Sequence, residues 1–317
     1  MTTNRDTRLV VKDNALIDAS FNLTLIEQRL MLLAIVEARE LKSLTPETPI
    51  EVKASAYIEQ YKVDESNAYS QLAEASKQLF NRQFSYIDRY NNNESITVSR
   101  WVNEVTYVTD RGMVVLYLNR NVISMISRLQ EQFTRYHLSQ VSDFKSNHSI
   151  RLYEILVKFI NIGNSSKYAI QELRSLLGIE DNEYKSISYL KRDVIDKAVK
   201  EINDKTDITV KYDQFKDGKT ITHILFKIKK KPVKKGSRED QNTVDMFADM
   251  TDKQINMFGD KLSKDRMFQS CYIAKEGDST QQYAIDIKNK LLDPFYVREW
   301  MVHLERVGYV PSVKKGA

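Results

Sequence analysis

The chain has 317 residues, of which 42% are hydrophobic, so it is long enough for two domains with ordinary cores. Its 48 basic and 43 acidic side chains give a net charge of +5, which alone says little about nucleic-acid binding. No run approaches the roughly 20 apolar residues of a membrane span, and the first residues contain no signal-peptide core. The single cysteine, Cys271, excludes an internal disulfide and a thiolate metal site, so we expect a globular, cytoplasmic protein that contacts no membrane.

The first half of the chain contains three predicted helices followed by strands. One helix begins at Thr24, where Thr24 and Glu27 have the spacing of a capping box. A second helix fits Ala54–Tyr61, and a third runs from Ser66 to Arg82. The third helix is expected to bury a face made of Tyr69, Leu72, Ala73, Ser76, Leu79 and Phe80. The predicted strands are separated by polar turns and span Phe84–Tyr90, Ile96–Val108 and Met113–Leu118.

The second half repeats this order of elements. The predicted helices span His148–Ile160, Ala169–Leu177 and Ser186–Asn203. Gly178 follows the middle helix as a C-terminal stop. The last helix is amphipathic, and its apolar stripe consists of Ile187, Leu190, Val194, Ala198, Val199 and Ile202. Two strands, Ile208–Phe215 and Thr220–Ile228, then flank Asp217-Gly218, which is a strong two-residue hairpin signal.

Three helices and a hairpin, used twice, predict an α+β fold of two tandem winged-helix domains, at residues 9–130 and 131–231. A polar linker at 232–242 contains Pro232 and Gly236. Residues 243–317 form a small helical appendage, in which helices fit Gln281–Leu291 and Pro294–Val307. Its recurring methionines and phenylalanines are more typical of packing than of a binding surface: Met246, Phe247, Met250, Met257, Phe258, Met267 and Phe268. We expect this appendage to act in partner recruitment or dimer control, and both winged-helix cores to form without it.

Local charge is a stronger indication of DNA binding than net charge. The helix at 186–203 is cationic on its polar face, and lysines crowd the end of the second hairpin: Lys227, Lys229, Lys230, Lys231, Lys234 and Lys235. Clustered cations supply the part of DNA affinity that does not depend on sequence. Two simpler interpretations stay open, namely a solvated surface helix beside an ordinary hairpin and a solvated linker.

Catalytic motifs are mostly absent from the sequence. Gly218-Lys219-Thr220 resembles the end of a phosphate-binding loop, but that motif needs glycine at position 213, where the chain has Asp213. The histidines at 137, 148, 223 and 303 are scattered, without the spacing of a zinc or nicking-enzyme site. We therefore predict a protein that is not an enzyme and that uses no cofactor and no metal.

Four ordered motifs are similar to the iteron-binding plasmid replication initiators, the RepE-like or Rep3 family. They are LIDASFNLTLIEQRL at 16–30, SIRLYEIL at 149–156, YLKRDVIDKAVKEIN at 189–203 and GKTITHILF at 218–226. The resemblance covers about residues 9–231. It implies two winged-helix domains that bind repeated sites in plasmid origin DNA, melt the adjacent duplex with a host replication initiator and help to load the replicative helicase. It also implies a monomer and a dimer, of which the dimer represses the protein's own gene, and a bacterial, plasmid-associated location.

The resemblance implies that the helix at 186–203 reads bases in the major groove. The residues expected to do so are Lys185, Ser186, Ser188, Tyr189, Lys191 and Arg192. At about 100° per residue, Lys191 falls near the apolar stripe, so its stem is expected to pack while its ammonium reaches toward DNA. The expected DNA-backbone contacts are Lys77, Arg82, Lys200, Lys216, Lys219, Thr220, Thr222 and His223.

The sheet at 84–118 has two interpretations. In the resembled family this sheet contributes to dimerisation, whereas its apolar alternation also suits the domain's own core. The function also has alternatives. One is a winged-helix transcriptional repressor without a replication role, which would bind an inverted site in a promoter instead of direct repeats beside A·T-rich DNA. The other is a nicking replication enzyme, which would need a divalent metal and would cleave DNA.

Overall fold

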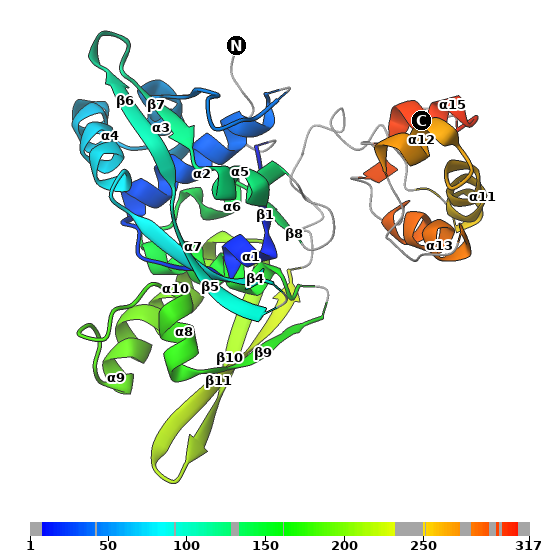
Figure 1. The fold of residues 1–317 in the computed structure, drawn as a ribbon. Coiled ribbons are helices and arrows are strands. Elements are labelled where there is room, and N and C mark those ends of the chain that lie inside the picture. Colours follow the sequence, from blue (N-terminus) through cyan, green and yellow to red (C-terminus); the bar gives the residue numbers. More distant parts are fainter. Residues whose placement is uncertain are drawn as a thin grey trace, which may run out of the picture. The chain divides into compact units, whose positions relative to one another are not determined.

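The computed structural model describes residues 8–41, 43–91, 93–127, 133–160, 162–231, 250, 252–272, 280–291, 296–297 and 300–309. The chain forms two compact units, Met1–Pro232 and Val233–Ala317. The first unit contains both predicted winged helices (Figure 1). The proposed domain boundary at 130/131 and the proposed linker at 232–242 lie outside the described residues.

The three helices of the first module begin and end close to the predicted positions. They are α2 (Leu25–Arg39), α3 (Ala54–Tyr61) and α4 (Glu65–Leu79). The predicted capping box is confirmed, because the Thr24 hydroxyl accepts from the Glu27 backbone N–H at 3.3 Å and the Glu27 carboxylate accepts from the Thr24 N–H at 2.6 Å. This reciprocal pair satisfies two of the N–H groups that a helix start leaves without a partner.

The buried face of α4 differs from the prediction at its aromatic residues. The helix buries Ala68, Leu72, Ala75, Ser76 and Leu79. Tyr69 and Phe80, which we expected to be buried, are 41% and 42% exposed. The Tyr69 ring lies over Gly112, where a Cβ would come within 2.0 Å of it, and the Arg100 guanidinium lies 5.6 Å from the Phe80 ring. Both rings therefore pack at the surface, against Gly112 and Arg100, instead of in the core.

The strands of the first module form two small sheets. One has the order β2-β4-β5, from β2 (Ser20–Phe21), β4 (Gln83–Tyr90) and β5 (Asn93–Arg100). The other has the order β3-β7-β6, from β3 (Ile50–Lys53), β6 (Val102–Val108) and β7 (Met113–Leu118). The prediction of one strand over Ile96–Val108 was wrong. The chain changes sheets at Trp101, whose side chain is 1% exposed and packs against Phe21 and Phe84.

The second module has the predicted helices and wing, with one further strand. Its elements are α7 (Asn147–Val157), β9 (Asn164–Ala169), α8 (Ile170–Leu176), α9 (Ile187–Leu190), the π turn η3 (Lys191–Ile195), α10 (Asp196–Lys205), β10 (Ile208–Asp217) and β11 (Thr220–Lys230). Gly178 ends the α8 region with φ +69°, as predicted. The strand β9 was not predicted, and it pairs with β11 to give a sheet of order β10-β11-β9.

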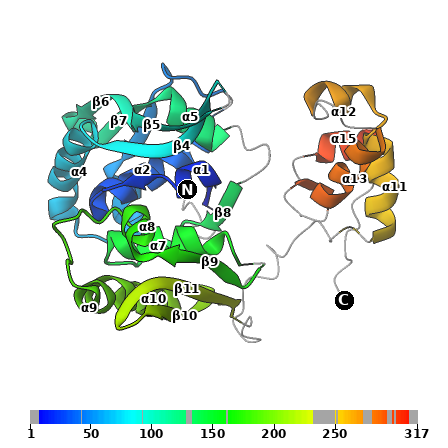
Figure 2. The same cartoon turned by 60° about the horizontal axis from the view of Figure 1, so that its bottom comes forward.

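The two modules share one hydrophobic core. Strand β1 (Leu9–Asp13), near the start of the described chain, pairs antiparallel with β8 (Phe133–His137). Short helices α1 (Asn14–Ile17), α5 (Arg120–Ser127) and α6 (Ser139–Ser142) and the one-turn helix η2 (Thr109–Arg111) complete the unit. Helix α7 lies between the two groups of elements in both views (Figures 1 and 2). Buried residues from Val10 to Ile228 form a single cluster, so the modules are packed together instead of joined by an open linker.

The second unit has a small core of its own. Its described helices are α11 (Asp252–Leu262), α12 (Arg266–Cys271), α13 (Thr280–Leu291) and α15 (Met301–Arg306). The predicted helix at 281–291 is confirmed, and of the predicted helix at 294–307 the structure describes α15 and 296–297. Of the predicted packing residues, Met250, Phe258 and Phe268 are buried, whereas Met257 and Met267 are 47% and 61% exposed and Met246 and Phe247 lie outside the described residues. In the described part of the chain, no helix is long and apolar enough to cross a membrane.

Candidate nucleic-acid interface

The polar helix of the second module is interrupted by a π turn. Ser186 caps α9 by accepting from the Ser188 backbone N–H at 3.3 Å. The π turn then adds a residue to the helix, so Ile195, which lay outside the predicted stripe, is fully buried together with the predicted Leu190 and Val194. We predicted a continuous helix, and nothing in the sequence indicates the π turn. Such turns are rare and occur often at functional sites.

Five of the six residues expected to read bases are exposed on this helix or just before it: Lys185, Ser186, Ser188, Tyr189 and Arg192. Tyr189 is 54% exposed. Lys191 is partly buried, which agrees with the expectation that its stem packs. Lys200, expected at the DNA backbone, is exposed on α10. The helix therefore presents a polar surface with several cations to solvent.

Arg192 is held by two neighbours on the same helix. Its Nη2 and Nε donate to the Asp193 carboxylate at 2.6 and 3.2 Å, and its guanidinium carbon lies 4.9 Å from the centre of the Tyr189 ring. Lys197 pairs with the same carboxylate at 3.2 Å. The hydrogen bonds from Arg192, helped by Lys197, lower the pKa of Asp193 to about 2, so this carboxylate is ionised at neutral pH. Asp193 was not among the residues predicted to act at this site.

The wing is the hairpin of β10 and β11, which extends from the body of the unit (Figure 1). Asp217 pairs with Thr220, so the two turn residues are Gly218 and Lys219, one position later than predicted. Gly218 has φ +56° at the first turn position, where glycine is favoured in hairpins. Lys216, Lys219 and Thr220 are exposed at this tip, as a phosphate-contacting wing requires.

Thr222 and His223 lie further back on the wing and are only partly exposed. The register shifts between Phe215 and Lys216, and Thr222 donates to the Phe215 carbonyl at 3.4 Å. His223 Nδ1 lies 3.0 Å from the Thr222 hydroxyl. These two side chains are already engaged with each other and with the strand, so they are less available for phosphate than the residues at the tip.

The base of the wing is joined to the helix by polar contacts. Tyr212 donates to the Asp196 carboxylate at 2.6 Å. Burial raises the pKa of the Tyr212 phenol, and the Asp196 carboxylate raises it further. Asn203 bonds both the N–H and the carbonyl of Val210, at 2.6 and 2.9 Å. Because these bonds span the two elements, they fix the angle between helix and wing.

The lysines at the exit of the wing have different roles. Lys231 donates to the carbonyls of Asn203 and Thr206 at the end of α10, so it is a structural residue. Lys227 pairs with Asp213 across the hairpin at 2.6 Å. Lys229 and Lys230 are exposed, and Lys234 and Lys235 lie outside the described residues. Lys167, which we had not considered, lies 4.1 Å from the Phe215 ring and adds a cation beside the wing.

In the first module, Lys77 is exposed on α4 but Arg82 is engaged in the fold. Arg82 Nε donates to Glu27 at 2.9 Å, and the Glu27 side chain is fully buried while that of Arg82 is 34% exposed. A buried carboxylate without a partner is costly, so this arginine stabilises the start of α2. The structure thus gives Arg82 a structural role that its position in the sequence did not indicate.

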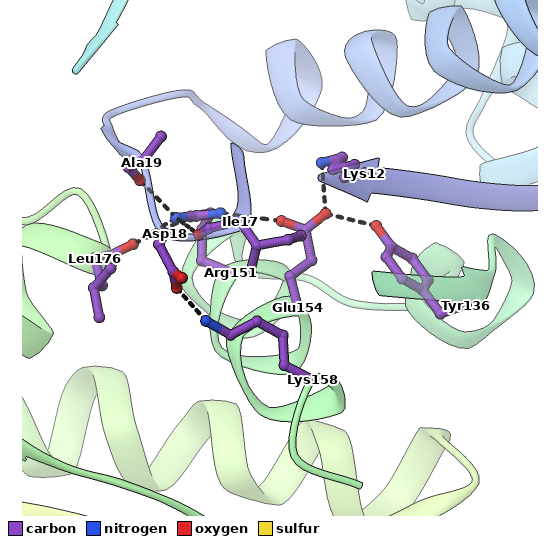
Figure 3. Close-up of polar contacts among 9 residues, drawn as sticks. All are labelled: Lys12, Ile17, Asp18, Ala19, Tyr136, Arg151, Glu154, Lys158 and Leu176. Carbon is purple, nitrogen blue, oxygen red and sulfur yellow. Dashed lines mark hydrogen bonds and ion pairs between the residues drawn. The ribbon is translucent and has the colours of Figure 1, made fainter. Parts of the chain in front are cut away.

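A buried ion cluster joins the two modules (Figure 3). Glu154 on α7 accepts from Lys12 on β1 and from the Tyr136 hydroxyl on β8, both at 2.6 Å, and from Arg151 at 3.1 Å. Arg151 Nη2 also donates to the carbonyls of Ile17, Ala19 and Leu176, each at 2.9 Å. Burial alone would raise the pKa of Glu154, but the charges of Lys12 and Arg151 outweigh it and lower that pKa. This cluster was not predicted, because Lys12 lies far along the chain from its other members.

Across the described ranges, no three histidine, cysteine, aspartate or glutamate side chains lie together as a metal site would require. The helix and the hairpin of the second module instead place several exposed hydrogen-bond donors and cations on its described surface. Donors of this kind match phosphate oxygens and base edges.

Two modules of three helices and a hairpin, packed in one unit, define a tandem winged-helix protein. Two family models match: the model described as "Initiator Replication protein, WH1" at residues 9–157 and "Initiator Rep protein, WH2" at residues 169–228. The chain therefore belongs to the Rep3 family of replication initiator proteins, as the sequence motifs indicated. Neither model extends into the second unit.

Similar proteins and structures agree with this assignment. A replication initiation protein of Escherichia coli is 23% identical over 80% of this chain and 77% of its own length. A 27.6 kDa protein of the same organism is 25% identical over 69% of this chain and 94% of its own length. The crystal structure of the Pi initiator protein in complex with iteron DNA has a TM-score of 0.59 at 24% identity and covers 71% of this chain and 98% of that one. The similarity to the Pi initiator structure supports the winged-helix fold.

Proposed function

We propose that this protein initiates plasmid replication by binding repeated origin sites, or iterons, through both winged helices. The observation that carries this proposal is the shared location of α9 and the wing. The two elements lie at the same end of the first unit in both views (Figures 1 and 2), and the residues exposed there include the cations Lys185, Arg192, Lys216 and Lys219. A helix for the major groove beside a hairpin for the flanking phosphates is the arrangement that duplex recognition needs.

In this proposal the second module reads bases. Lys185, Ser186, Ser188, Tyr189, Lys191 and Arg192 face the major groove, with Arg192 the best suited to donate to guanine O6 and N7. Lys216, Lys219 and Thr220 contact phosphates from the wing tip, and Lys200 contacts them from α10. Thr222 and His223 complete the wing contact only by rearranging their present hydrogen bonds.

The first module contributes backbone contacts. Its third helix, α4, lies on the same side of the unit as α9 in both views (Figures 1 and 2), which supports binding of both modules along one duplex. Lys77 is the exposed cation of α4 for this role. The guanidinium of Arg82 reaches phosphate while its Nε remains on Glu27, because an arginine has five N–H donors.

Footprinting on the plasmid that carries the gene tests this proposal. We expect protection of direct repeats next to A·T-rich DNA. Protection of a single inverted site at the promoter, with none at direct repeats, would instead support the transcriptional repressor. A cleaved product after incubation of the protein with supercoiled origin DNA and magnesium would support the nicking enzyme.

We also propose that a dimeric form represses the gene, and that it forms through the β4–β5 hairpin. Ile87 pairs with Ile96 across the hairpin, and Val98 lies two residues further on the same face. These side chains are 68%, 76% and 60% exposed. Strand β5 is also the edge of its described sheet, so its outer backbone groups are open to a second strand. An apolar face beside an open strand edge suits pairing with a second copy of the chain.

Sedimentation of the full-length protein tests the dimer. Replacing Ile87 and Ile96 by serine should shift the protein toward monomer, while Thr97→Ser on the other face of the same hairpin should leave the balance unchanged. A dimer that persists in the double variant would place the interface elsewhere. In the same proposal the monomer melts A·T-rich DNA with a host initiator and recruits the replicative helicase, which permanganate reactivity of unpaired thymines would detect.

A further inference from the structure

One acidic residue of the polar helix, Asp193, pairs with two of the cations beside it. It lies between Arg192 and Lys197, and its side chain is 24% exposed. A carboxylate at this place repels DNA phosphates, so its presence needs a reason. Consecutive residues on an α-helix do not face each other, but in a π turn successive side chains are rotated by a smaller angle, and both Arg192 and Asp193 lie in the turn.

The geometry of the pair determines which donors Arg192 has left. Asp193 takes one N–H of Nη2 and the N–H of Nε, which form the side edge of the guanidinium. The second N–H of Nη2 and both N–H groups of Nη1 remain at the end of the group. Of these, the Nη2 N–H and one Nη1 N–H are parallel, and they form the fork that binds guanine O6 and N7 together. The carboxylate thus occupies the edge that a guanine does not need.

The surroundings also limit the positions that the guanidinium can adopt. The Tyr189 ring lies 4.9 Å from the guanidinium carbon, and Lys197 holds the carboxylate from the next turn. An arginine that is already oriented loses less conformational freedom when it binds. An arginine without this support can instead turn toward any nearby phosphate.

We propose that Asp193 is a positioning residue that aims Arg192 at a guanine and thereby makes base recognition selective. This inference rests on the proposed function, because it assigns a role to a residue behind a base contact. It predicts different effects of removing Asp193 on sequence discrimination and on non-specific binding. Removing Asp193 removes a negative charge from the DNA-binding surface, yet it should weaken discrimination between sites while leaving binding to random DNA as tight as before or tighter.

The test measures dissociation constants by fluorescence anisotropy for the full-length protein. The probes are a repeat from the plasmid origin, a set of duplexes in which each base pair of that repeat is changed in turn, and a random duplex. In Asp193→Ala, discrimination at one G·C pair should fall by about tenfold. Affinity for the random duplex should not fall, and discrimination at the other pairs should be kept.

Three further variants make the result specific. Asp204→Ala removes the same charge from an exposed position near the end of α10 and should leave the whole profile unchanged. Asp193→Asn keeps one acceptor oxygen and should retain part of the discrimination. In Arg192→Ala the same G·C preference should be lost, and adding Asp193→Ala to it should cause no further loss at that pair.

Each other outcome contradicts the inference in a different way. An unchanged profile in a folded Asp193→Ala protein would show that Asp193 has no part in recognition. Equal weakening on all duplexes, including the random one, would show a merely structural role. A wild-type protein that binds all duplexes alike would overturn the proposed function itself, and this inference with it.

Discussion

The two winged-helix modules have the same order of elements but use their cations differently. In the first module, Arg29 donates to the carbonyls of Ser142 and Phe144, Arg82 to Glu27, and Arg100 to the carbonyl of Phe80. In the second module, the exposed cations include Lys185, Lys216 and Lys219. These arginines of the first module therefore hold the fold together, as Arg151 does in the second, whereas the helix and wing of the second module expose several cations. A count of basic residues does not distinguish the two uses, whereas their contacts do.

The largest expected effect concerns the buried cluster that joins the modules. Glu154→Ala removes the carboxylate between Lys12 and Arg151 and leaves two buried cations unpaired. The free energy of unfolding should fall by about 3–5 kcal/mol, measured by urea denaturation. As a control, Asp143→Ala breaks an exposed pair with Lys62 and should leave stability almost unchanged. A small effect of Glu154→Ala would mean that this carboxylate contributes little to the stability of the fold.

The same cluster should make stability depend on acidity. The folded-state pKa of Glu154 is lowered from its ordinary 4.5, so its stabilising contribution is present above pH 4.5 and is lost as the pH falls through the folded-state value. Urea titrations between neutral and acidic pH should therefore show a decline that is shallower in Glu154→Gln. Equal slopes in the two proteins would argue that Glu154 is not ionised in the folded protein.

The next effect sharpens the division of labour between the modules. Arg192→Ala should reduce discrimination at one base pair by roughly 5- to 150-fold, the range of a bidentate base contact. Lys77→Ala in the first module should instead weaken binding to all duplexes alike. Both variants are titrated against the cognate repeat and against repeats with single base-pair changes. Unchanged discrimination in a folded Arg192→Ala protein would remove this residue from base readout.

A smaller and more uniform effect is expected at the wing. Replacing Lys216 and Lys219 by alanine should weaken binding to every duplex and reduce the log-log salt slope by about two, if each lysine contacts one phosphate. Sequence preference should stay nearly constant. A double variant of Lys229 and Lys230 has the same charge change at the other end of the hairpin. Indistinguishable salt slopes in the wing-tip variant and the wild type would show that the tip points away from DNA.

The smallest effect should come from removing the second unit. Both winged helices end before Lys231, and residues 233–317 form a separate unit with its own core. Truncation after Lys235 should leave a folded protein whose affinity for repeated origin DNA is within about tenfold of the full chain. Loss of cooperative unfolding or of specific binding in the truncated protein would make the second unit part of the DNA-binding core.

Much of the local structure could be predicted because it depends on neighbouring residues. The capping box of Thr24 and Glu27 lies within four positions, and Gly178 and Gly218 adopt positive φ where turns were expected. The features that were not predicted depend on packing between residues that lie far apart in the sequence or on different strands. The chain changes sheets at Trp101 because the indole is buried between Phe21 and Phe84, which lie far from it in sequence or on another strand.

The candidate site shows the same limit. The exposure of Lys185, Tyr189 and Arg192 followed from helical periodicity, because the spacing of the apolar stripe determines the opposite face. The π turn could not be predicted, because its hydrogen bonds between residues five apart have no distinct residue pattern. The structural roles of Arg82 and Lys231 also escaped, because their partners are a buried carboxylate and the helix-end carbonyls.

Methylation interference on an origin repeat tests the central claim most directly, because a methyl group on guanine N7 blocks a major-groove contact. We predict that methylation of one guanine in each repeat prevents binding of the wild-type protein. Arg192→Ala should lose this sensitivity, whereas Lys77→Ala should keep it. If the Arg192→Ala protein remains folded, binds the repeat and is still inhibited by the same methylated guanine, the second module does not read that base through Arg192 and the account is contradicted.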